Sequence, residues 1–173
     1  MRAVLARLAV VAALLAAGAA HGEGWEPFFA PFLGDLRSEL AEAKKAGRKG
    51  VVVMYHFDAC PYCARMKTEI LSRPDVQQAF SREFVAVAID TRGALEITGL
   101  DGKTLPERDH ARAAGVRGTP TFDFIAPDGT RLYRHVGALK DPAEFILLGR
   151  YVASGEHRSR TFTDYKLLKP KGI

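Results

Sequence analysis

The sequence predicts an α/β domain in which helices flank a central β-sheet. Two apolar runs, at 50–57 and 84–90, are rich in β-branched and aromatic residues and show no polar alternation, which is typical of strands buried on both faces. Segments with helical periodicity alternate with these runs, and two further strands follow as a hairpin. The expected order of elements is α-β-α-β-α-β-β-α, which indicates a single layered domain.

The first helix is expected directly after Asp35, which can cap it, and Gly47 suits its C-terminal end. Its apolar face is formed by Leu36, Leu40 and Ala43. The strand at 50–57 follows. A second helix is expected from about Pro61, because proline is favourable at the first helical position. The inward residues of this helix are Met66, Ile70 and Leu71.

The second half of the domain follows the same logic. Pro74 ends or kinks the second helix, and another helical piece leads into the strand at 84–90. A glycine-rich insertion, Thr91 to Pro106, can contain a short hairpin, and a short helix then ends at Gly115. A Pro-Asp-Gly turn joins the last two strands. The final helix is expected to be capped by Asp141. Its inward residues are Phe145, Leu148 and Val152.

Residues 1–20 are expected to be a signal peptide outside the fold. Two arginines precede an apolar run from about Leu8 to Ala17, and small residues with an A-x-A type site follow. The run is shorter than the ~18 residues that a spanning helix needs. Cleavage after Ala19 or Ala20 is therefore expected, and an uncleaved anchor is the alternative.

The charge balance argues against a nucleic-acid-binding role. Removal of the signal peptide would reduce the 25 basic residues to 23 against 20 acidic ones, a net charge of +3, and no cluster of Lys and Arg stands beside aromatic residues. Export would bring the chain into an oxidising compartment, where disulfides form and persist.

The motif that carries chemistry is C-P-Y-C, whose Cys60 and Cys63 are the only cysteines. At the start of a helix, the Cys60 sulfur would face the free N–H groups of the first turn and the positive end of the helix dipole. Both favour the thiolate, and cysteine pKa values in such motifs fall from about 8.5 to between about 3.5 and 7.5. Because the thiolate is the nucleophile of disulfide exchange, Cys60 is expected to attack, and the less exposed Cys63 to resolve the mixed disulfide.

Two other interpretations of the cysteine pair carry less weight. A structural disulfide closing so short a loop would stabilise the fold by only ~2 kcal/mol. Zinc needs four ligands, and His56 is the only further candidate nearby. Copper(I) prefers soft thiolates, so a copper(I)-binding chaperone stays an alternative. Redox chemistry is the main interpretation, with no metal and no cofactor besides the disulfide itself.

Thr119-Pro120, directly before a predicted strand, is the second candidate element. An ordinary turn would explain it, since only about 5–6% of X–Pro bonds in folded proteins are cis. A cis proline, however, would leave the backbone of Thr119 unpaired and facing outward. An extended substrate could then add to it as a strand, which makes Thr119 and Pro120 candidate substrate-binding residues.

These two motifs resemble those of the thioredoxin superfamily. The segment "VVVMYHFDACPYCARM" is followed by "GVRGTPTFDFIAPDG", and the chain is most similar to secreted bacterial thioredoxin-like proteins of the SoxW type. The resemblance implies a thioredoxin-like fold with a central mixed sheet of about four strands. It divides the chain into the signal peptide (1–20), a lead-in (21–34), the thioredoxin-like domain (35–155) and a C-terminal tail (156–173).

The resemblance also implies roles for the site residues. Cys60 matches the attacking cysteine and Cys63 the resolving one. Pro120 matches the cis proline beside them. Pro61 and Tyr62, between the cysteines, tune the redox couple.

Two positions depart from the pattern of cytosolic thioredoxins. Ala59 replaces an exposed aromatic residue, and Met54 replaces a buried acid on the preceding strand, which puts the proton path of the resolving cysteine in doubt. The nearest titratable residues in the sequence are His56 and Asp58. The C-P-Y-C motif also occurs in glutaredoxins, but no glutathione-binding signature accompanies it, so glutathione use is not expected.

The implied activity is that of a periplasmic thiol–disulfide oxidoreductase that reduces disulfides in partner proteins. Its own disulfide would be reduced again by a membrane electron donor of the DsbD or CcdA kind. Sulfur-oxidation carrier proteins or apocytochromes are the implied clients. The opposite direction, an oxidase that donates its disulfide to folding proteins, uses the same residues and stays an alternative.

Overall fold

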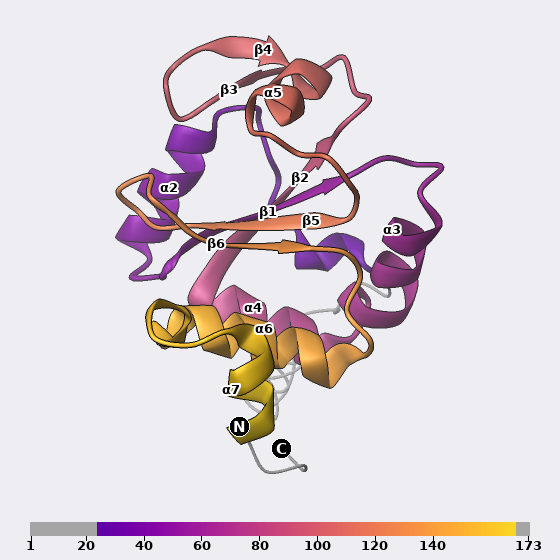
Figure 1. The fold of residues 1–173 in the computed structure, drawn as a ribbon. Coiled ribbons are helices and arrows are strands. Elements are labelled where there is room, and N and C mark those ends of the chain that lie inside the picture. Colours follow the sequence, from indigo (N-terminus) through magenta and orange to yellow (C-terminus); the bar gives the residue numbers. More distant parts are fainter. Residues whose placement is uncertain (1–23, 169–173) are drawn as a thin grey trace, which may run out of the picture.

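The computed structural model describes residues 24–168. The expected signal peptide, residues 1–20, lies outside this range. Four strands form a central mixed sheet, and helices cover both of its faces (Figure 1). The predicted fold class and the predicted order of the main elements are confirmed.

The secondary structure agrees closely with the sequence pattern. Its elements in chain order are η1 (Glu26–Phe28), α2 (Leu36–Lys45), β1 (Gly50–His56), α3 (Pro61–Arg65), the π-helix η2 (Met66–Leu71), α4 (Pro74–Glu83), β2 (Phe84–Asp90), β3 (Glu96–Thr98), β4 (Thr104–Pro106), α5 (Glu107–Ala113), β5 (Thr121–Ile125), β6 (Arg131–Val136), α6 (Pro142–Ala153), η3 (Glu156–Arg158) and α7 (Phe162–Leu168).

Strand β1 lies at the centre of the sheet. It pairs in parallel with β2 and antiparallel with β5, and β6 extends the sheet beyond β5, which gives the order β2-β1-β5-β6. All its residues except His56 at the end are buried. Its run of β-branched and aromatic side chains therefore fills both faces of the sheet, as expected for a central strand.

Two hydrophobic cores lie on opposite faces of the sheet. One core joins the sheet to α3, η2, α4 and α6, and the rings of Phe80 and Phe145 stack in it with centroids 4.3 Å apart. The other core lies under α2 and α5 (Figure 1). The helix residues predicted to face inward are all buried, namely Leu36, Leu40, Ala43, Met66, Ile70, Leu71, Phe145, Leu148 and Val152.

The glycine-rich insertion between β2 and α5 contains the expected short hairpin, β3–β4. It stands at the end of the domain that also carries α5 (Figure 1). A bridge between Asp35 and Thr98 ties it to the start of α2. The buried Glu107 carboxylate accepts a hydrogen bond from the Asp90 N–H at 3.0 Å, which fixes the start of α5 against the end of β2.

The beginning of the C-terminal tail, up to residue 168, packs on the domain. The rings of Phe162 and Tyr165 on α7 lie 5.4 and 5.2 Å from that of Tyr151 on α6. The Tyr151 hydroxyl donates a hydrogen bond to the Arg160 carbonyl at 2.7 Å. Phe28 in the lead-in is likewise buried against Phe80. The packed unit therefore extends beyond 35–155 on both sides.

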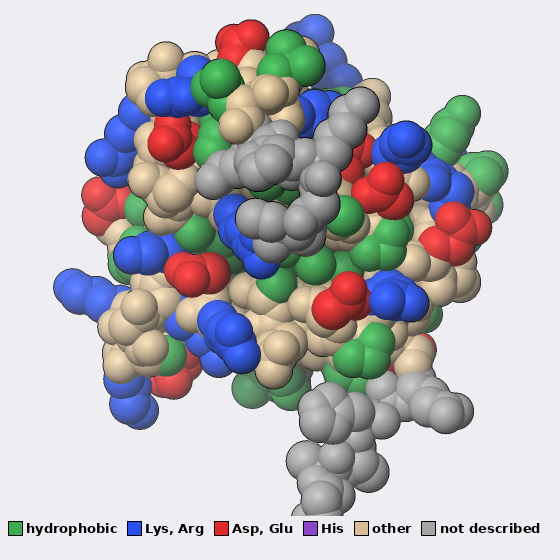
Figure 2. All heavy atoms as spheres, turned by 90° about the horizontal axis from the view of Figure 1, so that it is seen from below, with side chains coloured by type: hydrophobic (Ala, Val, Ile, Leu, Met, Phe, Trp, Pro, Cys, Tyr) green, Lys and Arg blue, Asp and Glu red, His purple; other side chains and the backbone are tan. Residues whose placement is uncertain are grey.

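The surface charges are mixed in sign where they can be seen. Figure 2 shows Lys and Arg side chains interspersed with Asp and Glu over the face viewed from below. This agrees with the small net charge of the sequence. Within residues 24–168, no helix is long and apolar enough to cross a membrane.

Helix α7 offers a direct test of whether the tail stabilises the domain. Phe162 is 7% exposed and Leu167 on the same helix is 79% exposed. Phe162→Ala is expected to lower the free energy of unfolding by about 3 kcal/mol, because it removes a buried aromatic ring. Leu167→Ala, the matched control, is expected to change it by less than about 0.5 kcal/mol. Urea denaturation measures both, and equal small effects would contradict the packing of the tail.

Candidate redox site

Cys60 occupies the N-cap of α3, where the chain leaves β1 and enters the helix. Its sulfur accepts a hydrogen bond from the Cys63 N–H at 3.1 Å. Pro61 stands at the first helical position, as predicted, where it needs no hydrogen-bond partner for its nitrogen. The sulfur therefore accepts a hydrogen bond from a first-turn N–H group that has no partner within the helix, at the positive end of the helix dipole, as the sequence predicted.

The structure joins Cys60 and Cys63 in a disulfide, with Cα atoms 5.2 Å apart. Cys60 is 3% and Cys63 1% exposed. Cys63 is thus less exposed than Cys60, as the sequence predicted, but the two exposed fractions differ by little. Pro61 and Tyr62 between them are exposed, so these two residues present the motif to the solvent.

The second predicted element lies beside the first. The Thr119–Pro120 bond is cis, and the Thr119 hydroxyl donates a hydrogen bond to the Cys60 sulfur at 3.3 Å. The Thr119 carbonyl oxygen lies 3.7 Å from the same sulfur. Strand β5 begins at Thr121, so Thr119 lies just outside the ladder of the sheet. The sequence predicted a role for the Thr119 backbone and missed the contact made by its hydroxyl.

A second contact that the sequence did not reveal holds the motif in place. The Arg65 guanidinium donates hydrogen bonds to the carbonyls of Leu139 at 2.8 Å and Lys140 at 3.3 Å. It thereby ties the end of α3 to the loop before α6. An arginine in the last turn of a helix has many ordinary explanations, so no local signal could have identified this role.

The core beneath the cysteines is apolar. Met54, at the position where the resemblance implied a buried acid, is buried in the same cluster as Cys60 and Cys63. The buried carboxylates among the described residues lie elsewhere: Asp123 pairs with Arg134 at 2.5 Å, and Glu107 binds the Asp90 N–H. No described carboxylate therefore takes the place of the missing acid.

A basic pair stands at the end of β1. The His56 Nδ1 atom lies 3.3 Å from the Lys67 Nζ atom, and Lys67 also lies over the ring of Trp25, 4.3 Å from its centroid. Burial, together with the Lys67 ammonium, lowers the pKa of His56. Burial also lowers the pKa of Lys67. His56 is thus neutral at pH 7 and can accept a hydrogen bond from Lys67. Asp58, the other titratable residue near the motif, is exposed.

The described side chains offer few ligands for a metal ion near the cysteines. Among residues 24–168, no group of three or more His, Cys, Asp and Glu side chains could hold a metal ion. The copper(I) alternative would therefore depend on the sulfurs of Cys60 and Cys63.

Comparison with known proteins agrees with this geometry. A family model described as a thioredoxin-like domain matches residues 36–153. The chain belongs to the thioredoxin-like family. No curated protein matches the sequence.

Solved structures show the same fold. A thioredoxin from Thermus thermophilus is 31% identical, with a TM-score of 0.53, and the match covers 72% of this chain and 92% of that one. A thioredoxin-fold protein from Helicobacter pylori is 15% identical, with a TM-score of 0.61 and coverage of 83% and 88%. A putative disulphide-isomerase from Bacteroides thetaiotaomicron is 24% identical, with a TM-score of 0.55 and coverage of 77% and 94%. The superfamily predicted from the two motifs is confirmed.

The contact between Lys67 and His56 can be tested through the pKa of His56. Lys67→Met removes a positive charge beside His56 and is expected to raise the pKa of His56, because that charge disfavours the imidazolium. Titration of the imidazole by NMR in both proteins measures the shift. Lys45→Met, at an exposed residue of α2, is the control and should leave the pKa of His56 unchanged. A fall in this pKa in the Lys67 variant would contradict the interaction.

Proposed function

We propose that this protein is a thiol–disulfide oxidoreductase that reduces disulfides in partner proteins in the periplasm. The observation that carries the proposal is the convergence of two donors on one sulfur. The Cys63 N–H and the Thr119 hydroxyl lie 3.1 and 3.3 Å from the Cys60 sulfur. Hydrogen bonds to a charged acceptor stabilise it more than bonds to a neutral one, so this arrangement favours Cys60 as a thiolate once the disulfide is reduced.

The exchange proceeds in two steps. The Cys60 thiolate attacks one sulfur of the client disulfide, whose S–S bond breaks as the Cys60–client bond forms. The leaving client thiolate takes a proton from solvent. Cys63 then attacks the Cys60 sulfur: the Cys60–client bond breaks as the Cys60–Cys63 bond forms, and the Cys63 proton passes to the client sulfur that leaves. Two electrons pass to the client, which leaves as a dithiol.

The surroundings of the disulfide suit an extended client chain. Tyr62 in the motif and Val136 at the end of β6 are exposed apolar side chains. Thr119, just outside the sheet ladder, offers its backbone for strand-like pairing. An apolar rim around a backbone edge binds clients without requiring one particular sequence.

The cellular setting is inferred from the N-terminal pattern. Residues 1–20 have the layout of a signal peptide, and an exported reductase needs electrons from across the membrane. A membrane donor of the DsbD or CcdA kind would supply them, as expected for a protein of the SoxW type. The alternative, an oxidase, would instead need an electron acceptor that reoxidises the Cys60–Cys63 dithiol after each disulfide is donated.

Variants of the two cysteines test the assigned roles. Cys60→Ser is expected to abolish insulin disulfide reduction, because it removes the nucleophile. Cys63→Ser is expected to retain the attack and accumulate a mixed disulfide with the client, which non-reducing electrophoresis detects. Ser72→Ala, at the half-buried residue that caps the end of the same helical segment, is the control. Full activity of the Cys60 variant would show that another residue is the nucleophile.

The reduction potential decides the direction of electron flow. The purified protein, equilibrated in glutathione buffers and trapped with a thiol reagent, is expected to have a potential near that of thioredoxin, about −270 mV. Such a value fits a reductase. A potential near that of DsbA, about −120 mV, would instead make the protein an oxidase and overturn the proposed direction.

A further inference from the structure

A second site lies on the face of the sheet opposite the cysteines. A pocket of about 280 Å³ opens between the central sheet, the start of α2, α5 and the loop of the β3–β4 hairpin. Its apolar walls include Leu36, Leu100, Leu105, Ala113 and Ile125. The cysteines belong to the core on the other face, so the redox chemistry does not use this pocket.

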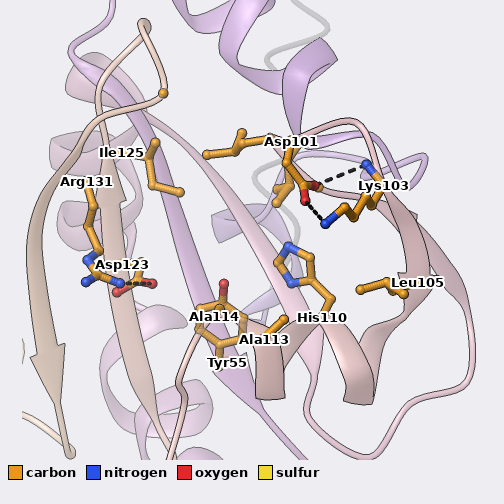
Figure 3. A pocket seen from close by; sticks show the side chains of 14 residues that line it. Tyr55, Asp101, Lys103, Leu105, His110, Ala113, Ala114, Asp123, Ile125 and Arg131 are labelled. Atoms are coloured by element: carbon orange, nitrogen blue, oxygen red, sulfur yellow. Dashed lines mark hydrogen bonds and ion pairs between the residues drawn. The ribbon is translucent and has the colours of Figure 1, made fainter.

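Two residues that line the pocket each carry a polar side-chain atom with no hydrogen-bond partner among the described residues. The Tyr55 side chain is 2% exposed, and its hydroxyl points into the pocket (Figure 3), where no described residue hydrogen-bonds to it. Burial raises the pKa of Tyr55, so the hydroxyl stays a donor at neutral pH. The Nδ1 atom of His110 is buried and also lacks a hydrogen-bond partner. A ligand group that accepted a hydrogen bond from the Tyr55 hydroxyl would use a donor that no described residue occupies.

A positive charge stands at the side of the same pocket. Asp123 is held by the Arg134 guanidinium through two hydrogen bonds, of 2.6 and 2.5 Å. Arg131 reaches the same carboxylate only at 3.9 Å, and its side chain is 52% exposed. One carboxylate cannot neutralise two guanidinium groups, so Arg131 keeps a positive charge available to a ligand. Across the pocket, Lys103 and Asp101 pair with each other at 3.5 Å (Figure 3).

The size and lining define the class of ligand. An apolar cavity of about 150 Å³ takes up one benzene molecule, so this pocket fits a compound of about ten non-hydrogen atoms. The apolar walls favour a hydrocarbon body. Tyr55 supplies a donor and Arg131 a cation, and both suit a carboxylate.

We propose that this pocket binds a small monocarboxylate with an aromatic or branched apolar body. The carboxylate lies between the Tyr55 hydroxyl and the Arg131 guanidinium, and the apolar body lies against Leu100, Leu105 and Ile125. The hairpin β3–β4 forms the outer wall of this site. The glycine-rich insertion thereby acquires a binding role that is separate from the cysteine motif.

Titration with phenylacetate, followed by NMR of the ¹⁵N-labelled protein, tests the proposal. Saturable shifts are expected at Leu100, His110 and Ala114, with a Kd of about 1 mM or tighter. Arg131→Gln is expected to weaken binding about tenfold and Tyr55→Phe about fivefold, since each removes one bond to a charged group. Arg112→Gln, at an exposed residue of α5 paired with Asp109, is the matched control and should leave the affinity unchanged.

Neutral 2-phenylacetamide, an isostere of the probe, separates charge from shape. It is expected to bind at least tenfold more weakly than phenylacetate. Equal affinity for both compounds, an unchanged Kd in the Arg131 variant, or no saturation at about 20 mM would overturn the proposal. Binding of a peptide that ends in phenylalanine, without binding of phenylacetate, would overturn it in favour of a protein-docking pocket. Insulin reduction by Arg131→Gln should equal that of the wild type, so the redox function is tested separately.

Discussion

Strand β1 forms hydrogen bonds with β2 on one side and β5 on the other, and helices cover both of its faces. A strand whose backbone is buried on all sides, such as β1, is stable only if its N–H and C=O groups are hydrogen-bonded within the sheet. The remaining elements are arranged around this requirement. The residues of β1 alternate between the two cores, so Met54 faces the cysteines and Tyr55 faces the opposite pocket.

The end of β1 determines where the cysteines lie. The chain leaves the sheet after His56 and begins α3 at Pro61, so Cys60 stands at a helix N-terminus and at the edge of a buried core. Thr119 reaches the same sulfur because β5, which it precedes, is the antiparallel neighbour of β1. Pairing of two strands thus brings two distant motifs together, and the pair of hydrogen bonds on Cys60 follows from the sheet topology.

The two faces of the sheet differ in chemical character. Around the cysteines the core is apolar and contains no described carboxylate, which leaves the Cys63 proton without the usual buried acceptor. On the other face, the buried Asp123 carboxylate pairs with the half-buried Arg134, and Arg131 lies 3.9 Å from the same carboxylate. Removing Arg134 alone would leave the buried Asp123 carboxylate without its main counter-charge, which is strongly destabilising. The buried carboxylates of the described residues therefore lie away from the redox site, and the insertion helps to form a pocket beside Asp123.

Local sequence patterns were enough to predict the strands, the helix faces, the caps at Asp35 and Asp141, and the position of Cys60 at the start of α3. These features depend on periodicity, proline placement and capping, all of which act within a few residues. Tertiary packing, in contrast, brings the Thr119 hydroxyl to Cys60, Lys67 to His56, and α7 onto α6. It also decided that Tyr55 and Arg131 share one pocket with the insertion. Such contacts join residues on different elements. The distances between these residues depend on strand order and loop paths, which no local pattern encodes.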